Sequence, residues 1–427
     1  MIIAHLADLH LGYRAYHRMA PGGINLREHD VAEAFRVALD RVIALEPDLV
    51  LVAGDVFHTV RPSNAAITNA FRQFLRLERA LPATPVVIIA GNHDAPRSVE
   101  SGSILRLLGE IGNVTVADGE SRRVELASLD TSVLCVPHPA LAVGEEIDYA
   151  PSSSGTNIMV LHGTVGGVDV EERLRRFGEY GGVRVEADDL QPERWDYIAL
   201  GHYHNVAQLT PNTWYAGALE RCSTNIWEES TVEKGFLTYD TAAREVAFHA
   251  VPTRQVIDLP RLSGRDENGG WRAAEALDDA IRERIEAVDG GIDDRIVRLV
   301  ITDITRELFR QLDHRALREY RARALHFHLD ARRPEIRREI GTGAPGTYRT
   351  LEEEVESFLA RRWKPSSGDI RPERLVELAR TYLKGTGEKL PLLEGSEPLI
   401  ETGQDEGNPP AEGEPSSAEP PAESGAE

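Results

Sequence analysis

The stretch VVIIAGNHDA, residues 86–95, joins a buried strand directly to three polar side chains. Its first five residues are apolar, a pattern typical of a strand that is buried on both faces. A glycine then ends the strand, and Asn92, His93 and Asp94 follow at once. An amide, an imidazole and a carboxylate at the end of a buried strand indicate a place where a ligand binds.

Four other apolar runs end in the same kinds of polar residue. They are ADLHLG (residues 7–12), AGDVFH (53–58), VLHGT (160–164) and LGHYH (200–204). Asp8 and His10 lie two positions apart, as do His202 and His204, and in an extended chain this spacing points both side chains the same way. Because the carboxyl ends of strands in an open α/β sheet border one crevice, we expect all five sets to converge.

The donors gathered in this way are carboxylates, imidazoles and an amide, which together suit a pair of divalent metal ions. A carboxylate such as Asp55 can bridge two cations. Neutral imidazoles favour transition ions, and carboxylate and amide oxygens accommodate Mn²⁺ or Fe²⁺. Two ions about 3.5–4 Å apart are a common arrangement for phosphoryl chemistry. The sequence therefore predicts a two-metal site, with Mn²⁺ as the expected ion and Mg²⁺ or Fe²⁺ as alternatives.

Around these motifs, apolar runs of strand length alternate with amphipathic helical segments over the first 250 residues. The expected strands are 2–7, 49–53, 86–90, 133–136, 158–161 and 197–200, and the expected helices are 30–46 and 63–81. Ser63 is a suitable N-cap for the second helix. This order predicts an α/β fold: a layered sheet domain with helices on its faces, a largely parallel centre and antiparallel strands at its end.

Changes in composition divide the rest of the chain. We expect the sheet domain over residues 1–252, a small α/β domain over 253–338, a linker and helical segment over 339–390, and a disordered acidic tail over 391–427. The tail is rich in Pro, Glu, Gly and Ser and has almost nothing to bury. Residues 306–338 carry ten arginines and five acidic residues, which is interpreted equally well as a solvated surface or as a contact surface for DNA phosphates.

The overall composition excludes several classes of protein. The chain of 427 residues is 41% hydrophobic and 28% charged, which is typical of soluble globular proteins, and no run approaches the ~18 apolar residues of a membrane span. No secretory signal is recognisable, and Cys135 and Cys222 lie far apart, so we expect two isolated buried thiols and a cytoplasmic location. The net charge of −22 argues against attraction of nucleic acid to the whole surface, so any such contact requires local basic patches, metal or a partner.

The series D-x-H, G-D, G-N-H-D, H and G-H-x-H resembles the calcineurin-like metallophosphoesterases. More narrowly, HLADLHLG (5–12), AGDVFHTVRPS (53–63), GNHD (91–94) and YAGALER (215–221) are similar to the SbcD and Mre nucleases, which repair DNA double-strand breaks. The resemblance covers about the first 225 residues, and the motifs are specific only when they are taken together.

The resemblance implies a role for each motif residue. It assigns metal one to Asp8, His10, Asp55 and His204, and metal two to Asp55, Asn92, His162 and His202. His93 would stabilise the transition state at the scissile phosphate or protonate the leaving 3′ oxygen, and His58 would help to hold the nucleotide. Asp94 would orient His93, and a water between the metals would be the nucleophile.

Several residues also have an ordinary structural interpretation. Asp94 is equally well interpreted as a turn residue, and Arg61 either contacts DNA phosphate or lies exposed in its loop. His5, inside the first expected strand, is interpreted as a packed or hydrogen-bonded histidine. His138, near another strand end, is left open with a preference for a structural role.

The sequence therefore predicts a Mn²⁺-dependent DNA exonuclease or endonuclease that acts in double-strand-break repair. A phosphodiesterase of cyclic or other small nucleotides and a non-catalytic scaffold that binds DNA ends are the alternatives. The resemblance also implies a homodimer, with helices near 63–81 or 100–110 as its candidates, and an SbcC-type coiled-coil ATPase that docks on helical residues 350–384. We expect no association with a membrane.

Overall fold

The computed structural model describes residues 1–95, 102–167 and 182–334, together with Phe358, Arg374 and Val376. These residues contain two six-stranded sheets, a three-stranded sheet and a two-stranded sheet. Apart from the three isolated residues, the predicted helical segment and acidic tail lie outside the described part of the chain. None of the described helices has the length and apolar character required to cross a membrane.

The first six-stranded sheet contains the strand from which the opening motif emerges. Its strands lie in the order β14 (Glu245–Val251), β13 (Lys234–Asp240), β1 (Ile2–Leu6), β2 (Leu49–Val52), β3 (Val86–Ile89) and β4 (Val114–Ala117). The four strands from β1 to β4 are parallel, whereas β13 and β14 pair antiparallel at one edge. The predicted parallel centre and antiparallel end are confirmed for this sheet.

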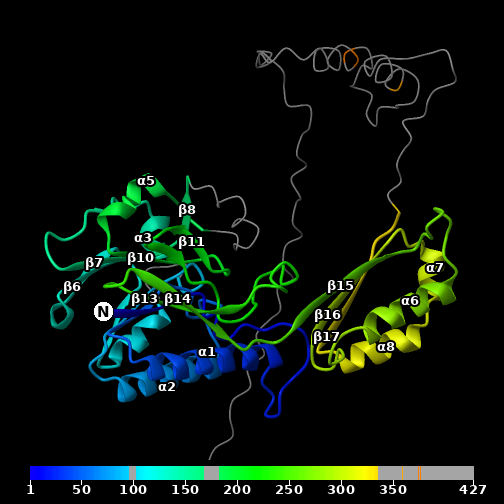
Figure 1. Ribbon diagram of the computed structural model, residues 1–427, viewed down its shortest axis with the longest axis horizontal. Coiled ribbons are helices and arrows are strands. Elements are labelled where there is room, and N and C mark those ends of the chain that lie inside the picture. The colour runs from blue at the N-terminus through cyan, green and yellow to red at the C-terminus, as the bar shows by residue number, and fades with distance from the viewer. Residues whose placement is uncertain (96–101, 168–181, 335–357, 359–373, 375, 377–427) are drawn as a thin grey trace, which may run out of the picture. The chain divides into compact units, whose positions relative to one another are not determined.

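Two long helices, α1 (Leu26–Leu45) and α2 (Asn64–Ala80), lie side by side over one face of this sheet (Figure 1). Phe35 and Phe74 of the helices pack in one core with alternate side chains of the strands, such as Val50. Ser63 caps α2 as predicted, because its side chain accepts a hydrogen bond from the Ala66 amide. Helix α1 begins four residues earlier than predicted, because Asn25 caps it through the Arg27 amide at 3.0 Å.

The second sheet packs against the opposite face of the first. Its strands lie in the order β11 (Ala207–Thr210), β12 (Thr213–Tyr215), β10 (Tyr197–Gly201), β7 (Thr156–His162), β6 (Thr131–Val136) and β5 (Arg122–Leu126). Leu51 and Ile89 of the first sheet share a buried core with Val160 of the second. The sequence predicts β6, β7 and β10 of this sheet but does not predict the division of the strands between two sheets.

Short elements cover the outer face of the second sheet and connect its strands. They are α3 (His138–Ala142), β8 (Thr164–Gly166), β9 (Arg184–Glu186), α5 (Ala187–Leu190) and η4 (Pro192–Arg194). The short helix η2 (Ile104–Glu110) instead packs with α2 and the first sheet, and η3 (Ala127–Leu129) connects β5 to β6. Leu190 and Trp195 pack with Leu161 in a further core on this side. The described residues of the sheet domain thus form layers of helix, sheet, sheet and short helices.

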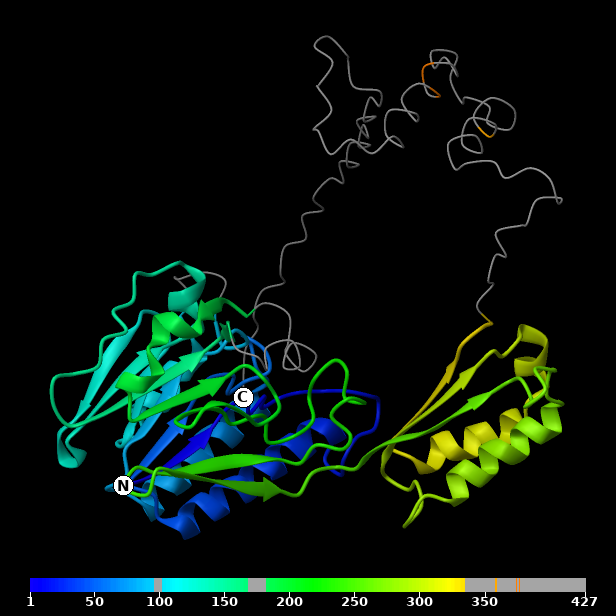
Figure 2. The ribbon, with the colours of Figure 1, turned by 45° about the horizontal axis from the view of Figure 1, so that its top comes forward.

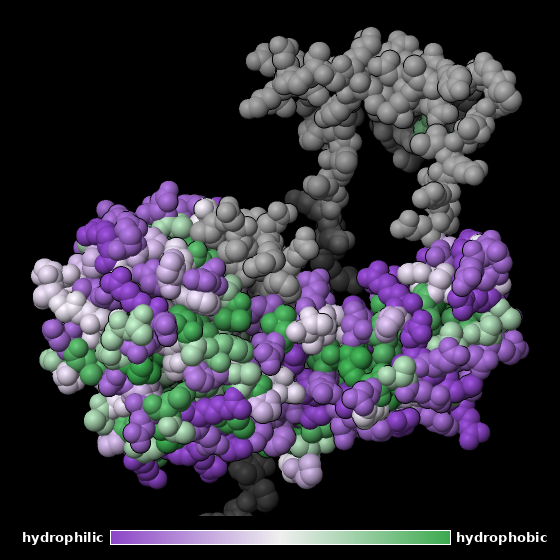
Figure 3. Space-filling view, in the orientation of Figure 1, coloured by the Kyte–Doolittle hydropathy of each residue, from purple (hydrophilic) through white to green (hydrophobic). Residues whose placement is uncertain are grey.

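A three-stranded parallel sheet follows, made of β15 (Val256–Ser263), β16 (Ile296–Thr302) and β17 (His326–Ala331). Helices α6 (Ala274–Glu286), α7 (Arg306–Gln311) and α8 (His314–Arg323) lie on one face of it (Figure 2). Leu277, Leu299 and Phe327 are buried between sheet and helices. In the space-filling view, hydrophobic side chains gather over this sheet, while the surface of the helices is largely hydrophilic (Figure 3).

Candidate metal centre

The polar residues of the five motifs all stand at or just beyond the carboxyl ends of strands. Those after the first sheet are Asp8, His10, Asp55, Asn92 and His93, and those of the second sheet are His162, His202 and His204. The ends of β1, β2 and β3 therefore face the ends of β7 and β10. Two sheets, and not the single open sheet on which the prediction was based, together build the site.

The prediction that Asp8 and His10 lie on an extended chain is wrong. Strand β1 ends at Leu6, and Asp8 and His10 have left-handed φ values of 51° and 47° instead of extended ones. Asp55 and His202 also have positive φ, at 53° and 110°. Such conformations cost on the order of 1–3 kcal/mol each and cluster at functional sites. The side chains converge because the chain turns sharply after each strand.

Two glycines allow the strand ends to approach each other. A Cβ atom at Gly91 would overlap the carboxylate of Asp55, and one at Gly54 would overlap the ring of His162. Gly54 also has a φ of 92°, which residues with a side chain rarely adopt. The glycines beside the polar motifs are therefore required by the closeness of the functional side chains.

The residues predicted for metal one form one end of the cluster. The Nε2 atoms of His10 and His204 lie 3.0 Å apart, and Nε2 of His10 lies 3.9 Å from Oδ2 of Asp55. Asp8 and Asp55 have donor atoms within 4.8 Å of each other and of His162, a residue predicted for metal two. Oδ1 and Oδ2 of Asp8 accept hydrogen bonds from the His202 amide at 3.0 and 3.1 Å, which fixes the carboxylate.

The residues predicted for metal two form the other end. Oδ1 of Asn92 lies 3.0 Å from Nε2 of His162 and 3.1 Å from Nδ1 of His202. Nε2 of His162 is 3.3 Å from Oδ2 of Asp55, the same oxygen that faces His10. One carboxylate oxygen therefore lies between the two sets, where a bridging ligand is needed.

Burial and neighbouring charges shift the pKa values of this cluster in both directions. Burial raises the pKa of the Asp8 carboxyl to about 6, even though His162 and His204 lower it. Burial lowers the pKa of His162, but the carboxylates of Asp55 and Asp8 outweigh burial and raise this pKa to about 9. Burial lowers the pKa of His202 to about 3, so its imidazole is neutral, as a metal ligand must be. Buried, closely facing ring nitrogens and carboxylates fit divalent metal ions.

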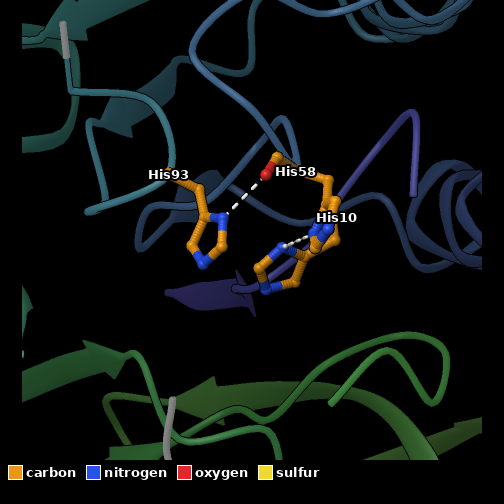
Figure 4. Close-up of side chains that lie close together, drawn as sticks. All are labelled: His10, His58 and His93. Atoms are coloured by element: carbon orange, nitrogen blue, oxygen red, sulfur yellow. Dashed lines mark hydrogen bonds between the residues drawn. The ribbon is translucent and has the colours of Figure 1, made fainter. Parts of the chain in front are cut away.

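His58 and His93 lie beside the metal-one residues. Nδ1 of His93 donates to the backbone carbonyl of His58 at 2.7 Å, and Nδ1 of His58 lies 3.3 Å from Nδ1 of His10 (Figure 4). The rings of His58 and His93 stack with their centres 5.2 Å apart. The His93 amide also donates to Oδ1 of Asp55 at 2.8 Å. Both histidines are partly exposed, in contrast to the buried ligand candidates.

Asp94 does not have the predicted role of orienting His93. Its buried carboxylate accepts hydrogen bonds from the amides of Val56, Phe57 and Gly91, at 3.0, 2.9 and 3.1 Å. The ring of His93 is held instead by the carbonyl of His58. Asp94 therefore ties the turn after β3 to the turn after β2, which is closer to its alternative interpretation as a turn residue.

The remaining residues considered above lie outside the cluster or at its edge. Arg61 is exposed in the loop between β2 and α2. His5 is buried and bonds the Tyr197 hydroxyl at 2.9 Å, which agrees with its structural interpretation. His138 is buried at the start of α3, with its ring centre 6.4 Å from that of His162. Cys135 and Cys222 are both buried and are not joined in a disulfide, as predicted.

A buried ion pair next to His204 is not predicted by the sequence. Nζ of Lys234 lies 3.0 Å from Oε2 of Glu229, and Oε1 of Glu229 lies 3.8 Å from Nδ1 of His204. Sγ of Cys222 is also 3.8 Å from this nitrogen. Glutamate and lysine side chains are normally solvated, so no pattern in the sequence distinguishes Glu229 and Lys234 from surface residues.

Comparison with known proteins agrees with this geometry. The family model described as calcineurin-like phosphoesterase matches residues 1–217. The DNA double-strand break repair protein Mre11 of Methanocaldococcus jannaschii is 28% identical over 258 residues, which are 58% of this chain and 64% of that protein. Mre11 of Sulfurisphaera tokodaii is 28% identical over 205 residues, covering 47% of this chain and 48% of its relative. The match thus spans less than two thirds of either relative.

Among solved structures, a dimetal phosphatase from Danio rerio is similar to 56% of this chain, which covers 91% of that structure. The TM-score is 0.31 and the sequence identity is 11%.

Proposed function

Because the chain belongs to the calcineurin-like phosphoesterase family, and is thus a metal-dependent phosphoesterase, we propose that it is a Mn²⁺-dependent DNA nuclease with a two-metal mechanism. The other six predicted ligand residues, from two sheets, lie around the Asp55 carboxylate, and this convergence carries the proposal. In this assignment metal one would be held by Asp8, His10, Asp55 and His204, and metal two by Asp55, Asn92, His162 and His202. Two such ions would activate a water and neutralise phosphate charge.

The role proposed for His93 follows from its hydrogen bond. A ring whose Nδ1 donates to the His58 carbonyl at 2.7 Å is stabilised when it is protonated, because a carbonyl oxygen favours the positive charge. Nε2, on the other side of the ring, can then donate its proton to a phosphate oxygen or to the leaving 3′ oxygen. His58, stacked beside His93, is proposed to hold the nucleotide during exonuclease cleavage.

DNA is proposed as the substrate for two reasons. The similar archaeal proteins are named as DNA double-strand break repair proteins. The small domain that we propose for residues 253–338 also presents exposed arginines. Arg306, Arg310, Arg318 and Arg321 make no ion pair within the described residues, so their charge can meet phosphate groups. We propose this surface and Arg61 as contacts to the DNA backbone.

Degradation of a linear duplex in the presence of Mn²⁺ tests the proposal. The His93→Ala variant is expected to keep both Mn²⁺ ions and to lose about 10²- to 10⁴-fold in cleavage rate, as removal of a proton donor does. Asp55→Asn is expected to lose metal binding as well. His17→Ala, which removes an exposed histidine, is the matched control. If His93→Ala binds metal normally and digests DNA at the full rate, the role proposed for His93 is wrong.

The same assay separates the alternatives. Cleavage of a cyclic nucleotide without cleavage of DNA would favour a small-nucleotide phosphodiesterase. Binding of DNA ends without hydrolysis of either substrate would favour a scaffold. The motif residues favour a catalytic protein over a scaffold, because all seven ligand candidates are present and close together.

Further parts of the proposal concern partners and location. We propose that residues 350–384 dock a coiled-coil ATPase of the SbcC type, that the protein acts as a cytoplasmic homodimer, and that residues 391–427 form an acidic extension. The docking segment and the extension lie almost entirely outside the described residues. Helix α2 or the short helix η2 would supply the dimer contact.

A further inference from the structure

The buried pair of Lys234 and Glu229 contacts both the backbone and the ring of His204. Nζ of Lys234 donates to the His204 carbonyl at 2.7 Å and to Oδ1 of Asn205 at 2.8 Å. On the ring side, Oε1 of Glu229 lies 3.8 Å from Nδ1 of His204. Glu229 is 0% exposed and Lys234 is 2% exposed. A single ion pair thus holds the His204 backbone by a hydrogen bond and places a carboxylate 3.8 Å from its ring.

The other nitrogen of the same ring faces the proposed metal site. Nε2 of His204 lies 3.0 Å from Nε2 of His10. An imidazole that gives the Nε2 lone pair to a metal carries its proton on Nδ1, and metal-bound histidines normally present that proton to a carboxylate or a carbonyl. The Glu229 carboxylate is on the correct side of the ring for this purpose.

Burial of a carboxylate without a partner would leave it protonated or destabilise the fold. Nζ of Lys234, 3.0 Å from Oε2 of Glu229, supplies the opposite charge beside this carboxylate. Lys234 is the first residue of β13, which pairs with β1. Its ammonium group therefore belongs to the same sheet as the strand that Asp8 and His10 follow.

We propose that Glu229 is a positioning residue for metal one: held by Lys234, it keeps the proton of His204 on Nδ1 and directs Nε2 to the metal. The inference rests on the two-metal site proposed above. It concerns the affinity of that site and the orientation of one ligand, and Glu229 touches neither substrate nor metal.

Cys222 competes with Glu229 as the partner of Nδ1 of the His204 ring. Its sulfur lies 3.8 Å from Nδ1 of His204, as far as the Glu229 oxygen does. Cysteine, histidine and glutamate could together bind a soft cation such as Zn²⁺ or Co²⁺. The ammonium group of Lys234 beside Glu229 opposes a further cation there. The charge balance therefore favours the positioning role.

Calorimetric titration of the full chain with Mn²⁺ tests this inference without measuring activity. Wild type is expected to bind two ions, and Glu229→Gln to bind one of them about 10- to 100-fold more weakly, the usual effect of removing such an orienting partner. Glu228→Gln, an exposed neighbour, is the matched control and should bind both ions as wild type does. The double variant Glu229→Met, Lys234→Met leaves no buried unpaired charge and serves if Glu229→Gln does not fold.

Each outcome decides one question. If the folded double variant or Glu229→Gln binds both ions with wild-type affinity, the positioning role is overturned while the two-metal proposal stands. If wild type binds no Mn²⁺, the proposed function itself fails. A sulfur-to-cobalt charge-transfer band in the Co²⁺ protein that disappears in Cys222→Ser would overturn the inference too, because Cys222 would then be a ligand at this position.

Discussion

The Nε2 atoms of His10 and His204 lie 3.0 Å apart, although 194 positions separate the two residues in the chain. His10 follows the first strand of one sheet, and His204 follows β10 of the other. Two ring nitrogens that face each other at this distance need a proton or a cation between them. The contact therefore joins the two sheets at the point where their strands end.

Glycine at position 91 is expected to be essential for the metal site. In Gly91→Ala the new Cβ would overlap the Asp55 carboxylate, which must then move. A shift of about 1 Å in a catalytic group can cost 10²-fold in rate. We expect a loss of at least this size in phosphodiester cleavage, together with weaker Mn²⁺ binding.

Gly119→Ala is the matched control for this substitution. No heavy atom lies within 4 Å of a Cβ at Gly119 among the described residues, apart from its chain neighbours, so activity and metal binding should remain. Equal activity of the two alanine variants would show that the Asp55 carboxylate need not occupy the position found here.

Asp94→Asn tests whether Asp94 supports two turns or orients His93. Asparagine places an amide group opposite backbone donors that now meet carboxylate oxygens, so hydrogen bonds from Val56, Phe57 or Gly91 are lost. We expect a decrease of about 1–3 kcal/mol in the free energy of unfolding, measured by urea denaturation of the metal-free protein.

The kinetic result separates the two roles. If Asp94 acts on His93, the variant should lose catalytic rate at unchanged stability and unchanged metal affinity. Loss of stability accompanied by weaker Mn²⁺ binding would instead agree with the hydrogen bonds found here, because the same turns carry Asp55 and Asn92.

Stability in acid should depend on His5. Burial lowers the pKa of this imidazole to about 3 from its ordinary value of 6.5. Between these values the unfolded chain binds a proton that the folded protein does not. Stability is therefore lost as the pH falls through this window, by up to about 1.4 kcal/mol per pH unit for this group.

His5→Asn removes this contribution and retains a polar group that can bond the Tyr197 hydroxyl. The free energy of unfolding of the metal-free variant, measured by urea denaturation from about pH 6.5 to 4.5, should fall less steeply than that of wild type. His17→Asn, which removes an exposed histidine, controls for the substitution itself. Identical slopes in wild type and His5→Asn would contradict a neutral buried His5.

Arg318 tests the proposed DNA surface of the small domain. Its side chain is exposed on α8, where Arg315 by contrast pairs with Glu319 at 3.3 Å. If Arg318 contacts a phosphate, Arg318→Ala should weaken binding of a linear duplex to a similar extent for every sequence. The slope of log K against log salt should then fall by about 1. Arg315→Ala is the paired control, and an equal salt slope in all three proteins would exclude Arg318 as a contact.

The sequence predicts those parts of the structure that depend on residues close together in the chain. Buried strands such as 86–90 and 197–200 are continuous apolar runs, and the polar residues that follow them mark the functional end of each strand. The structure brings the side chains of these motif residues to within a few ångströms of one another. The α/β fold is confirmed for the described residues.

Long-range pairing is what the sequence does not reveal. An apolar strand has the same pattern whichever sheet it joins, so the division of β1–β4 and β5–β7 between two sheets is not predictable from periodicity. The partners of Asp94 are backbone amides, which every residue but proline possesses. Glu229 and Lys234 are charged residues whose burial depends on their pairing in space.

The division of the donors between two sheets also sets a limit during synthesis. Asp8, His10, Asp55 and Asn92 come from the first sheet, whereas His202 and His204 follow a strand of the second. A ribosome must therefore release more than two hundred residues before the last imidazole can meet the first carboxylate. Until then a nascent chain has only some of the candidate metal ligands. Hydrolysis therefore begins only after both sheets have been synthesised and have folded together.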